Sequence, residues 1–403
     1  MQTWTDFANS QENERYGYMK AWVLHDINDI RYEDTRIPTL KSGEVLVRVM
    51  AAGICGSDIP RIYENGAHRM PLIPGHEFSG AVETVGPDVS KDWSGKRVGI
   101  FPLIPCNKCA PCRSRHPEMC RDYDYIGSRR DGAFAEFVAV PESNLIELPD
   151  NVSFEEAAML EPMAVAVHAM RKGAGEDSSQ HEDNSPQEDN SPHEKNSPDE
   201  NDASLEKDAK ILVFGLGTIG LLLTMFLKER GYSNIFVAGN KEPQKEKAKA
   251  LGIPEDHYID SRLQDVISYI MDKGGADVFF ECVGRNECVS SGIECATPGG
   301  KIVLVGNPYT DMTLPRDTYW KILRDQLRIE GTWNSTFLPR NSGKESSDDW
   351  SYVIKRLSEG RIRPSDLITQ KFPIEELEEG FHIMRDKTDY YCKVIMEADH
   401  SMI

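Results

Sequence analysis

Residues 210–220 read KILVFGLGTIG, an apolar run that ends in a glycine-rich turn. Gly215, Gly217 and Gly220 have the spacing G-x-G-x-x-G, with Ile219 before the last glycine, and the chain continues with a helical pattern. When such a turn joins a strand to a helix, its backbone N–H groups and the helix N-terminus bind a pyrophosphate. A glycine-rich turn without a ligand is the alternative. The context favours a dinucleotide site.

The sequence around this turn alternates between strands and helices. Apolar runs, separated by amphipathic helical stretches, lie at 211–214, 234–238, 277–281 and 301–305. This alternation predicts an α/β domain with a doubly wound parallel sheet, the Rossmann arrangement. We expect this nucleotide-binding domain to span residues 166–309.

The second of these strands ends without the acidic residue that usually binds the ribose of NAD, about 20 residues beyond the turn. Its end reads Gly239-Asn240-Lys241. A carboxylate here would repel a 2′-phosphate, whereas glycine leaves room for one and lysine offers a counter-charge. We therefore expect these three residues to contact the cofactor and to tolerate NADP as well as NAD. A lysine in a strand-end loop is also commonly just solvated.

The N-terminal part of the chain has a different sequence pattern. Short β runs at 44–50, 80–85, 97–100 and 132–140 are punctuated by Gly and Pro, which predicts an irregular β-rich domain. Ser153 and Glu156 have the spacing of a capping box and predict a helix start. Pro162 then predicts a turn of the chain at Glu161. Further on, a helix is predicted at 375–385 and a strand at 393–396.

Length and composition limit the class of protein. A chain of 403 residues predicts two domains. With 39% hydrophobic and 28% charged residues, coiled-coil and wholly disordered proteins are excluded. The net charge of −20 argues against nucleic acid or an anionic membrane as a partner. The N-terminus lacks the pattern of a secretory signal, and we expect a cytoplasmic protein.

Two segments do not have the composition of a folded domain. Residues 1–18 are polar and patternless, and we expect a disordered extension. An acidic insertion at 174–208 contains a hexapeptide repeat with NSP at its end, covering 181–198. Metal binding by its histidines and phosphorylation of its serines are alternative functions for this segment. A disordered surface loop with no role is the preferred interpretation.

Four cysteines lie within 15 residues, as Cys106, Cys109, Cys112 and Cys120. Four thiolates in one short loop match a closed tetrahedral zinc site, which leaves no position for a substrate. Two disulfides or four core thiols are the alternatives, but disulfides across two-residue gaps are strained. The spacing predicts a structural zinc ion.

A second group of metal-binding residue types is dispersed along the chain. Cys55 lies in GICGSD, His76 and Glu77 lie in GHE, and Glu161 precedes Pro162. Cysteine, histidine and carboxylate are all zinc ligands, and three of them with an open position describe a catalytic zinc. From spacing alone the case is weak, because lone Cys and His residues usually belong to the core or the surface.

The sequence from residue 19 to residue 396, apart from the insertion, resembles the zinc-dependent medium-chain alcohol and polyol dehydrogenases. The stretches that carry the resemblance are the four-cysteine segment, GICGSDIPRIYENGAH at 53–68, PGHEFSG at 74–80, YIGSRRDGAFAEF at 125–137 and EPMAVAVHA at 161–169. The resemblance implies a GroES-like catalytic domain at 19–165, completed by 310–403. It also implies one structural and one catalytic zinc, NAD or NADP as cofactor, and a homodimer or homotetramer.

The resemblance further implies roles for individual residues. Catalytic zinc falls on Cys55, His76 and a carboxylate, and Ser57 matches the hydroxyl that relays the substrate proton. Zinc with one thiolate, one imidazole and one carboxylate is neutral, so we expect Glu161 as the third ligand. Glu77 would then lie behind the metal ligands or exchange with water and substrate.

The expected substrate is a small polyol, and a hexitol phosphate such as galactitol 1-phosphate is preferred. Arg129 and Arg130 would bind the phosphate, although two solvated loop arginines are about as plausible from the residues alone. His68 and Asn334 are candidates for hydroxyl contacts. The alternatives are activity on sorbitol or L-iditol, butanediol or L-threonine, and a non-catalytic, zinc-stabilised nucleotide sensor.

Overall fold

The structure is a computed structural model, and it describes residues 17–175, 205–339 and 348–398. The chain forms two compact units, one made of residues up to Val165 and from Asn334 onward, the other of Ala166–Trp333. The hexapeptide repeat and nearly all of the predicted N-terminal extension lie outside the described residues. Within the described ranges, no helix is both long and apolar enough to cross a bilayer.

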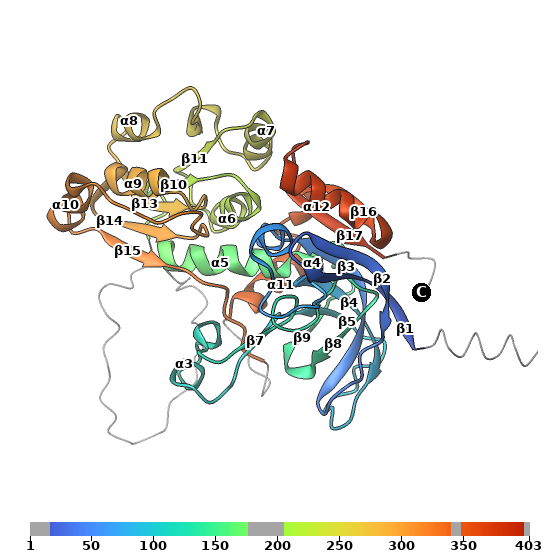
Figure 1. The fold of residues 1–403 in the computed structure, drawn as a ribbon. Coiled ribbons are helices and arrows are strands. Elements are labelled where there is room, and N and C mark those ends of the chain that lie inside the picture. The colour runs from blue at the N-terminus through green and yellow to red at the C-terminus, as the bar shows by residue number, and fades with distance from the viewer. Residues whose placement is uncertain (1–16, 176–204, 340–347, 399–403) are drawn as a thin grey trace, which may run out of the picture. The chain divides into compact units, whose positions relative to one another are not determined.

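The second unit is built on a six-stranded parallel sheet in the order β12-β11-β10-β13-β14-β15. Figure 1 shows the sheet with its connecting helices. In chain order the strands read 3-2-1-4-5-6, so the predicted doubly wound sheet is confirmed. The strands are β10 (Ile211–Phe214), β11 (Ile235–Gly239), β12 (Tyr258–Asp260), β13 (Ala276–Glu281), β14 (Ala296–Leu304) and β15 (Arg328–Gly331).

The strands β10 and β11 at the centre of this sheet are apolar along their length, as expected of strands that helices cover. Leu212, Phe236, Phe279 and Ile302 from four neighbouring strands form one buried cluster. The helices are α6 (Thr218–Glu229), α7 (Glu242–Ala250), α8 (Val266–Met271), α9 (Asn286–Cys295) and α10 (Arg316–Arg324). The strand β15 lies beyond residue 309, where the sequence analysis ended this domain. Its residues Arg-Ile-Glu-Gly form no apolar run, which explains why the pattern did not indicate it.

The first unit is β-rich, as predicted. Its main sheet has seven strands in the order β16-β17-β3-β4-β5-β9, with β8 also paired to β3. These strands are β3 (Glu44–Ile54), β4 (Glu77–Val85), β5 (Arg97–Ile100), β8 (Phe137–Pro141), β9 (Leu145–Glu147), β16 (Ile368–Pro373) and β17 (Lys393–Glu397). Because β17 pairs with β3, the C-terminal segment completes a sheet begun by the N-terminal segment.

Smaller elements surround this sheet. Two strand pairs are formed by β1 (Tyr18–Asp26) with β2 (Asp29–Arg36) and by β6 (Leu103–Ile104) with β7 (Asp124–Tyr125). The α-helices are α2 (Asp58–Pro60), α3 (Ala110–Arg113), α4 (Phe154–Ala158), α5 (Leu160–Ala174), α11 (Asp349–Ser358) and α12 (Leu377–Asp386). The helix α5 starts in the first unit and ends in the second.

The predicted capping box is present at the start of α4. The Ser153 hydroxyl accepts from the Glu156 N–H at 3.2 Å, and the Glu156 carboxylate accepts from the Ser153 N–H at 3.3 Å. The turn expected at Glu161 lies two residues earlier, at Met159, so that expectation was wrong in position. Pro162 instead occupies the first turn of α5, where a missing N–H costs no intrahelical hydrogen bond.

Candidate metal centres and nucleotide site

Two neighbouring strands of the first unit bring Cys55, His76 and Glu77 together. The strand β3 ends at Ile54, directly before Cys55, and β4 begins at Glu77, directly after His76. The two strands are antiparallel, with Gly53 opposite Glu77. One ligand atom from each of the three side chains lies within 4.8 Å of the other two. A thiolate, an imidazole and a carboxylate at this spacing fit a zinc ion.

Asp58 supports this group, and the sequence analysis did not single it out. Its buried carboxylate accepts from the Cys55 N–H at 3.0 Å and from Arg61 Nη1 at 2.5 Å. Its Oδ1 also lies 3.5 Å from His76 Nδ1. Burial by itself lowers the pKa of His76, but the Asp58 and Cys55 charges outweigh burial and raise it to about 10. Within the described ranges His76 Nδ1 has no hydrogen-bond partner, so the contact with Asp58 is electrostatic, on the side where carboxylates behind metal-bound histidines lie.

Glu77 forms a fully buried ion pair with Lys393, the first residue of β17. The ammonium group of Lys393 also donates to the Ile54 carbonyl at 3.2 Å. The two side chains meet above Gly53 in the intervening strand. A Cβ on that glycine would lie 2.5 Å from Glu77 Oε2 and 2.6 Å from Lys393 Cε. Gly53 is therefore required by the ion pair.

Glu161 lies near His76 through a shared neighbour, Tyr125. Its Oε1 accepts from the Tyr125 hydroxyl at 3.3 Å, and the Tyr125 ring packs edge-on against His76 with centroids 5.8 Å apart. Burial raises the pKa of Glu161, and the His76 charge and the Tyr125 hydrogen bond oppose that rise. Burial, followed by the charge of Glu161, raises the pKa of Tyr125, so the hydroxyl stays a donor. Glu161 is not in the tight group of ligand atoms.

Charge was the reason for preferring Glu161 to Glu77 from the sequence, and Lys393 changes that balance. A divalent ion with the Cys55 thiolate and both carboxylates would carry one negative charge. The buried ammonium of Lys393 cancels it. Burial lowers the pKa of Lys393 to about 8, the Cys55 and Asp58 charges oppose that fall, and the Glu77 carboxylate pairs with the ammonium form. Both carboxylates are therefore compatible with a neutral centre.

The four cysteines of the second candidate centre converge as the sequence predicted. Their sulfur atoms all lie within 4.8 Å of one another. Cys109 Sγ is 3.4 Å from Cys112 Sγ and 3.9 Å from Cys120 Sγ. A tetrahedral zinc site with Zn–S bonds of about 2.3 Å has sulfur atoms about 3.8 Å apart. Backbone N–H groups, first that of Arg121, hold the pKa of Cys109 at about 6, which favours the thiolate.

The nine cysteines are all free thiols in the structure, so no disulfide closes the four-cysteine loop there. Cys106 contributes a further contact to that loop, because its N–H donates to Cys120 Sγ at 3.2 Å. The fit of this loop to a zinc ion therefore rests on sulfur geometry and on amide donors that stabilise thiolates.

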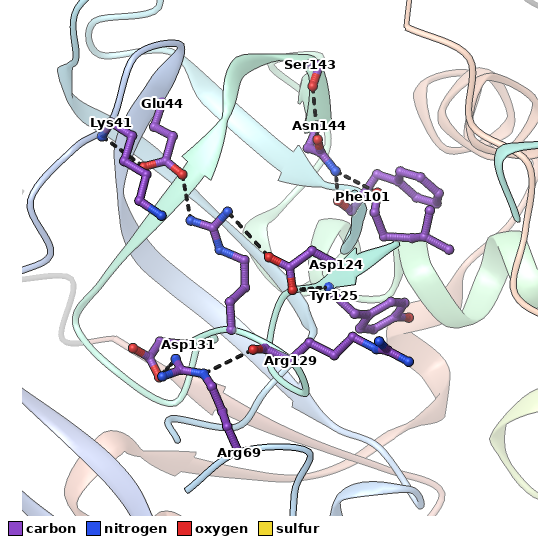
Figure 2. Close-up of polar contacts among 12 residues, drawn as sticks. Lys41, Glu44, Arg69, Phe101, Asp124, Tyr125, Arg129, Asp131, Ser143 and Asn144 are labelled. Atoms are coloured by element: carbon purple, nitrogen blue, oxygen red, sulfur yellow. Dashed lines mark hydrogen bonds and ion pairs between the residues drawn. The ribbon is translucent and has the colours of Figure 1, made fainter. Parts of the chain in front are cut away.

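The adjacent residues Arg129 and Arg130 have different surroundings. Arg130 is paired with the buried Glu44 at 2.6 Å and lies 4.0 Å from Asp124. The Arg129 guanidinium stacks over the Tyr123 ring at 4.4 Å, and its Nε is buried without a hydrogen-bond partner. Figure 2 shows the Arg129 side chain running beside Tyr125. Among the described residues, no carboxylate pairs with Arg129.

The other candidate site residues are Ser57, His68 and Asn334. The Ser57 hydroxyl donates to Cys55 Sγ at 3.3 Å, so it touches the candidate metal centre. His68 lies in a bend of the chain. The Asn334 side chain accepts from the Ser335 N–H at 3.0 Å, and Asn334 has a left-handed φ of 59°. The roles of His68 and Asn334 stay predictions.

The glycine-rich turn of the second unit has a geometry that suits a pyrophosphate. Gly215 has a φ of +101°, and a Cβ on Gly220 would collide with the Gly215 carbonyl oxygen. Gly217 precedes the first residue of α6, and a Cβ there would meet open space. Packing within the protein thus requires two of the three glycines, while the third leaves room for a ligand at the helix N-terminus. Ile219 lies in the first turn of α6.

The end of β11 is closed to an acidic side chain. A Cβ on Gly239 would lie 2.9 Å from both Gln244 Oε1 and the Tyr258 hydroxyl. Gln244, which the sequence analysis missed, accepts from the Asn240 N–H at 2.9 Å and donates to the Leu216 carbonyl at 3.0 Å. It thereby ties the end of β11 to the glycine-rich turn. Lys241, at the N-cap of α7, follows directly.

Comparisons with known proteins agree with this geometry. The model of the alcohol dehydrogenase GroES-like domain matches residues 41–150, and that of the zinc-binding dehydrogenase matches 218–359. L-idonate 5-dehydrogenase of Vitis vinifera is 30% identical over 376 residues, covering 90% of each chain. Galactitol 1-phosphate 5-dehydrogenase of Escherichia coli K12 is 29% identical over 364 residues, covering 90% of this chain and 95% of the relative.

Solved structures show the same fold. That of galactitol-1-phosphate dehydrogenase from Escherichia coli matches with a TM-score of 0.77 at 27% identity, covering 94% of this chain and all of that one. The structure of RspB from Escherichia coli CFT073, complexed with the cofactor NADH, matches with a TM-score of 0.78 at 26% identity, covering 94% and 99%.

The four-cysteine centre predicts the effect of removing one thiol. Cys106→Ser should lower the zinc content of the purified protein by one ion per chain and lower its thermal midpoint by about 5 °C or more, because structural zinc contributes folding energy. Metal analysis and calorimetry measure both. Cys288→Ser, which removes a buried thiol outside the loop, is the control and should keep the full zinc content. Unchanged zinc in Cys106→Ser would contradict the assignment.

Proposed function

The chain belongs to the zinc-dependent medium-chain alcohol dehydrogenases, and on this premise we propose that it oxidises a secondary alcohol of a polyol with NAD or NADP as hydride acceptor. The observation that carries the proposal is the convergence of Cys55, His76 and Glu77 ligand atoms within 4.8 Å of one another. A zinc ion at such a site acts as a Lewis acid that lowers the pKa of an alcohol.

Cys55, His76 and Glu77 would hold this ion, with Glu161 as a second carboxylate. The chain contributes orientation through buried partners. Asp58 steadies the imidazole, Lys393 holds Glu77, and Tyr125 holds Glu161. The hydroxyl of Ser57, 3.3 Å from Cys55 Sγ, is the atom that we propose takes up the alcohol proton and passes it outward.

The second unit would bind the cofactor, which supplies the hydride chemistry. Gly215, Gly217 and Gly220 support a pyrophosphate site at the N-terminus of α6. The absence of a carboxylate at Gly239, which would repel a 2′-phosphate, supports acceptance of NADP. We therefore propose that NADP is used at least as well as NAD. The nine free thiols support a reducing compartment such as the cytoplasm.

We propose a phosphorylated hexitol as the substrate, with galactitol 1-phosphate as the first candidate. A relative of that name is 29% identical, and Arg129 is a half-buried cation without a carboxylate partner among the described residues, beside Tyr123 and Tyr125. Arginine binds phosphate with charge-assisted hydrogen bonds. Arg130 is no longer part of this proposal, because Glu44 already neutralises it.

Two other functions stay in view. Free polyols, butanediol or L-threonine would use the same metal centre without Arg129. A non-catalytic nucleotide sensor would need only the four-cysteine zinc. The ion pair of Glu77 with Lys393, buried beside Cys55, argues against the sensor. Burying two charges is costly, and a sensor that binds no metal at Cys55 would have no use for this pair.

A substrate panel tests the proposed function. Free and phosphorylated hexitols, 2,3-butanediol and L-threonine are each supplied with NAD and with NADP, and formation of reduced cofactor is followed by absorbance. We expect the highest kcat/KM for a hexitol phosphate and a value with NADP at least equal to that with NAD. A strong NAD preference would contradict the cofactor proposal. If the zinc-loaded protein oxidises none of these alcohols, the proposed activity is contradicted and the non-catalytic nucleotide sensor becomes the preferred function.

The environment of Arg129 predicts a selective effect on phosphorylated substrates. Arg129→Ala should raise KM for a hexitol phosphate by about 10- to 100-fold, since it removes hydrogen bonds from a charged donor. KM for the free hexitol should change by less than about twofold, within the range of a surface substitution. Arg130→Ala serves as the matched control and should affect both substrates equally. An equal effect of Arg129→Ala on both would remove the phosphate argument.

A further inference from the structure

A carboxylate is buried at the carboxyl end of the parallel sheet without a cationic partner among the described residues. Glu281, the last residue of β13, is 1% exposed. Within the described ranges no basic side chain forms an ion pair with it. Its Oε1 accepts from the N–H groups of Val283 and Gly284, both at 2.8 Å, and its Oε2 accepts from Gly284 at 3.0 Å. Backbone amides therefore stabilise this charge.

The same residue holds the loop that follows the neighbouring strand β14. Its carbonyl oxygen accepts from the N–H groups of Val305 and Gly306, both at 2.9 Å. A Cβ on Gly306 would collide with Gly284 N and lie 2.8 Å from Glu281 Oε2. The Glu281 carboxylate thus holds the loop 282–284, while its main-chain carbonyl, which any residue would supply, holds the start of the loop 305–307.

This clamp adjoins the glycine-rich turn. Glu281 is paired in register with Phe214, the residue before Gly215. A Cβ on Gly215 would lie 2.6 Å from Val283 Cγ2 and 3.1 Å from the Cys282 carbonyl carbon. The loop that Glu281 holds is therefore packed directly on the predicted pyrophosphate turn.

The topology indicates which half of a dinucleotide meets the clamped loops. A doubly wound sheet binds its two mononucleotides on two halves, across the point where strand order reverses. The adenosine half would lie over β10, β11 and β12 if its ribose meets Gly239 at the end of β11, as proposed above. The other half of the sheet begins with β13 and β14, whose loops Glu281 holds.

From this juxtaposition we propose that Glu281 is a positioning residue for the nicotinamide half of the cofactor. Its carboxylate fixes the backbone of the loop after β13, against which Gly306 of the loop after β14 packs, so that the N–H and C=O groups there are preorganised before the nicotinamide and its ribose arrive. Burial raises the pKa of Glu281, and the N–H groups of Gly284, Val283 and Gly306 oppose that rise. The inference rests on the proposed use of NAD(P) as cofactor.

Binding measurements on the full chain separate the two halves of the cofactor. The Kd of NADH is compared with that of ADP-ribose, and the Kd of NADPH with that of 2′-phospho-ADP-ribose, by calorimetry without any alcohol. Glu281→Gln keeps the shape but removes the charge that the loop amides stabilise. It should weaken binding of the reduced dinucleotides about tenfold, as expected when charged hydrogen bonds are lost. Binding of both ADP-riboses should stay within about twofold.

Asp277→Asn is the matched control. Asp277 lies on the same strand at the opposite end of the sheet, and its carboxylate also accepts a backbone N–H, that of Lys210 at 2.8 Å. It should change stability without changing the ratio of the two Kd values. Gly306→Ala strains the same clamp with the charge intact and should reproduce the selective loss, and retained binding of the ADP-riboses shows that either variant is folded.

Equal weakening of dinucleotides and ADP-riboses in Glu281→Gln, or no weakening of either, would overturn the positioning role. A wild-type protein that binds neither NADH nor NADPH would instead overturn the cofactor assignment. The two failures are therefore distinguishable.

Discussion

The buried ion pair between Glu77 and Lys393 is the constraint on which the proposed catalytic metal centre depends. It joins the outer two of three adjacent strands across Gly53, beside Cys55 and His76. Burying two charges is costly unless each is well paired. A divalent ion bound by the Cys55 thiolate and by the carboxylates of Glu77 and Glu161 would leave one net negative charge. The ammonium group of Lys393 compensates this charge. The C-terminal strand β17 therefore pairs with β3 in the sheet and also supplies the positive charge of Lys393 beside the proposed metal centre.

In the second unit, the proposed pyrophosphate site is formed by glycines and backbone amides. Gly215 and Gly220 are required by close approaches within the protein, whereas Gly217 leaves open space at the start of α6. Gln244 is hydrogen-bonded to this turn directly, and Glu281 holds the loop that packs against it. Backbone N–H groups bind an anion well only when their directions are fixed. The hydrogen bonds made by Gln244 and Glu281 fix the loops that surround this turn.

Features with local spacing could be predicted from the sequence, and features that depend on long-range contacts could not. The four cysteines, the glycine-rich turn, the capping box at Ser153 and the parallel strands are each encoded within a few residues. Lys393 lies 316 positions from Glu77 in the chain, and nothing around it marks a partner. Arg129 and Arg130 are indistinguishable in sequence, yet one stacks on an aromatic ring and the other meets Glu44.

The most direct test of the catalytic centre is the zinc content of carboxylate variants after dialysis against a weak chelator, measured by elemental analysis. The wild-type chain should keep two ions. Glu77→Gln should keep one, because it removes a member of the tight ligand group and leaves Lys393 as an uncompensated charge. Glu161→Gln should keep two. Retention of both ions by Glu77→Gln, with loss of one from Glu161→Gln, would contradict the centre described above.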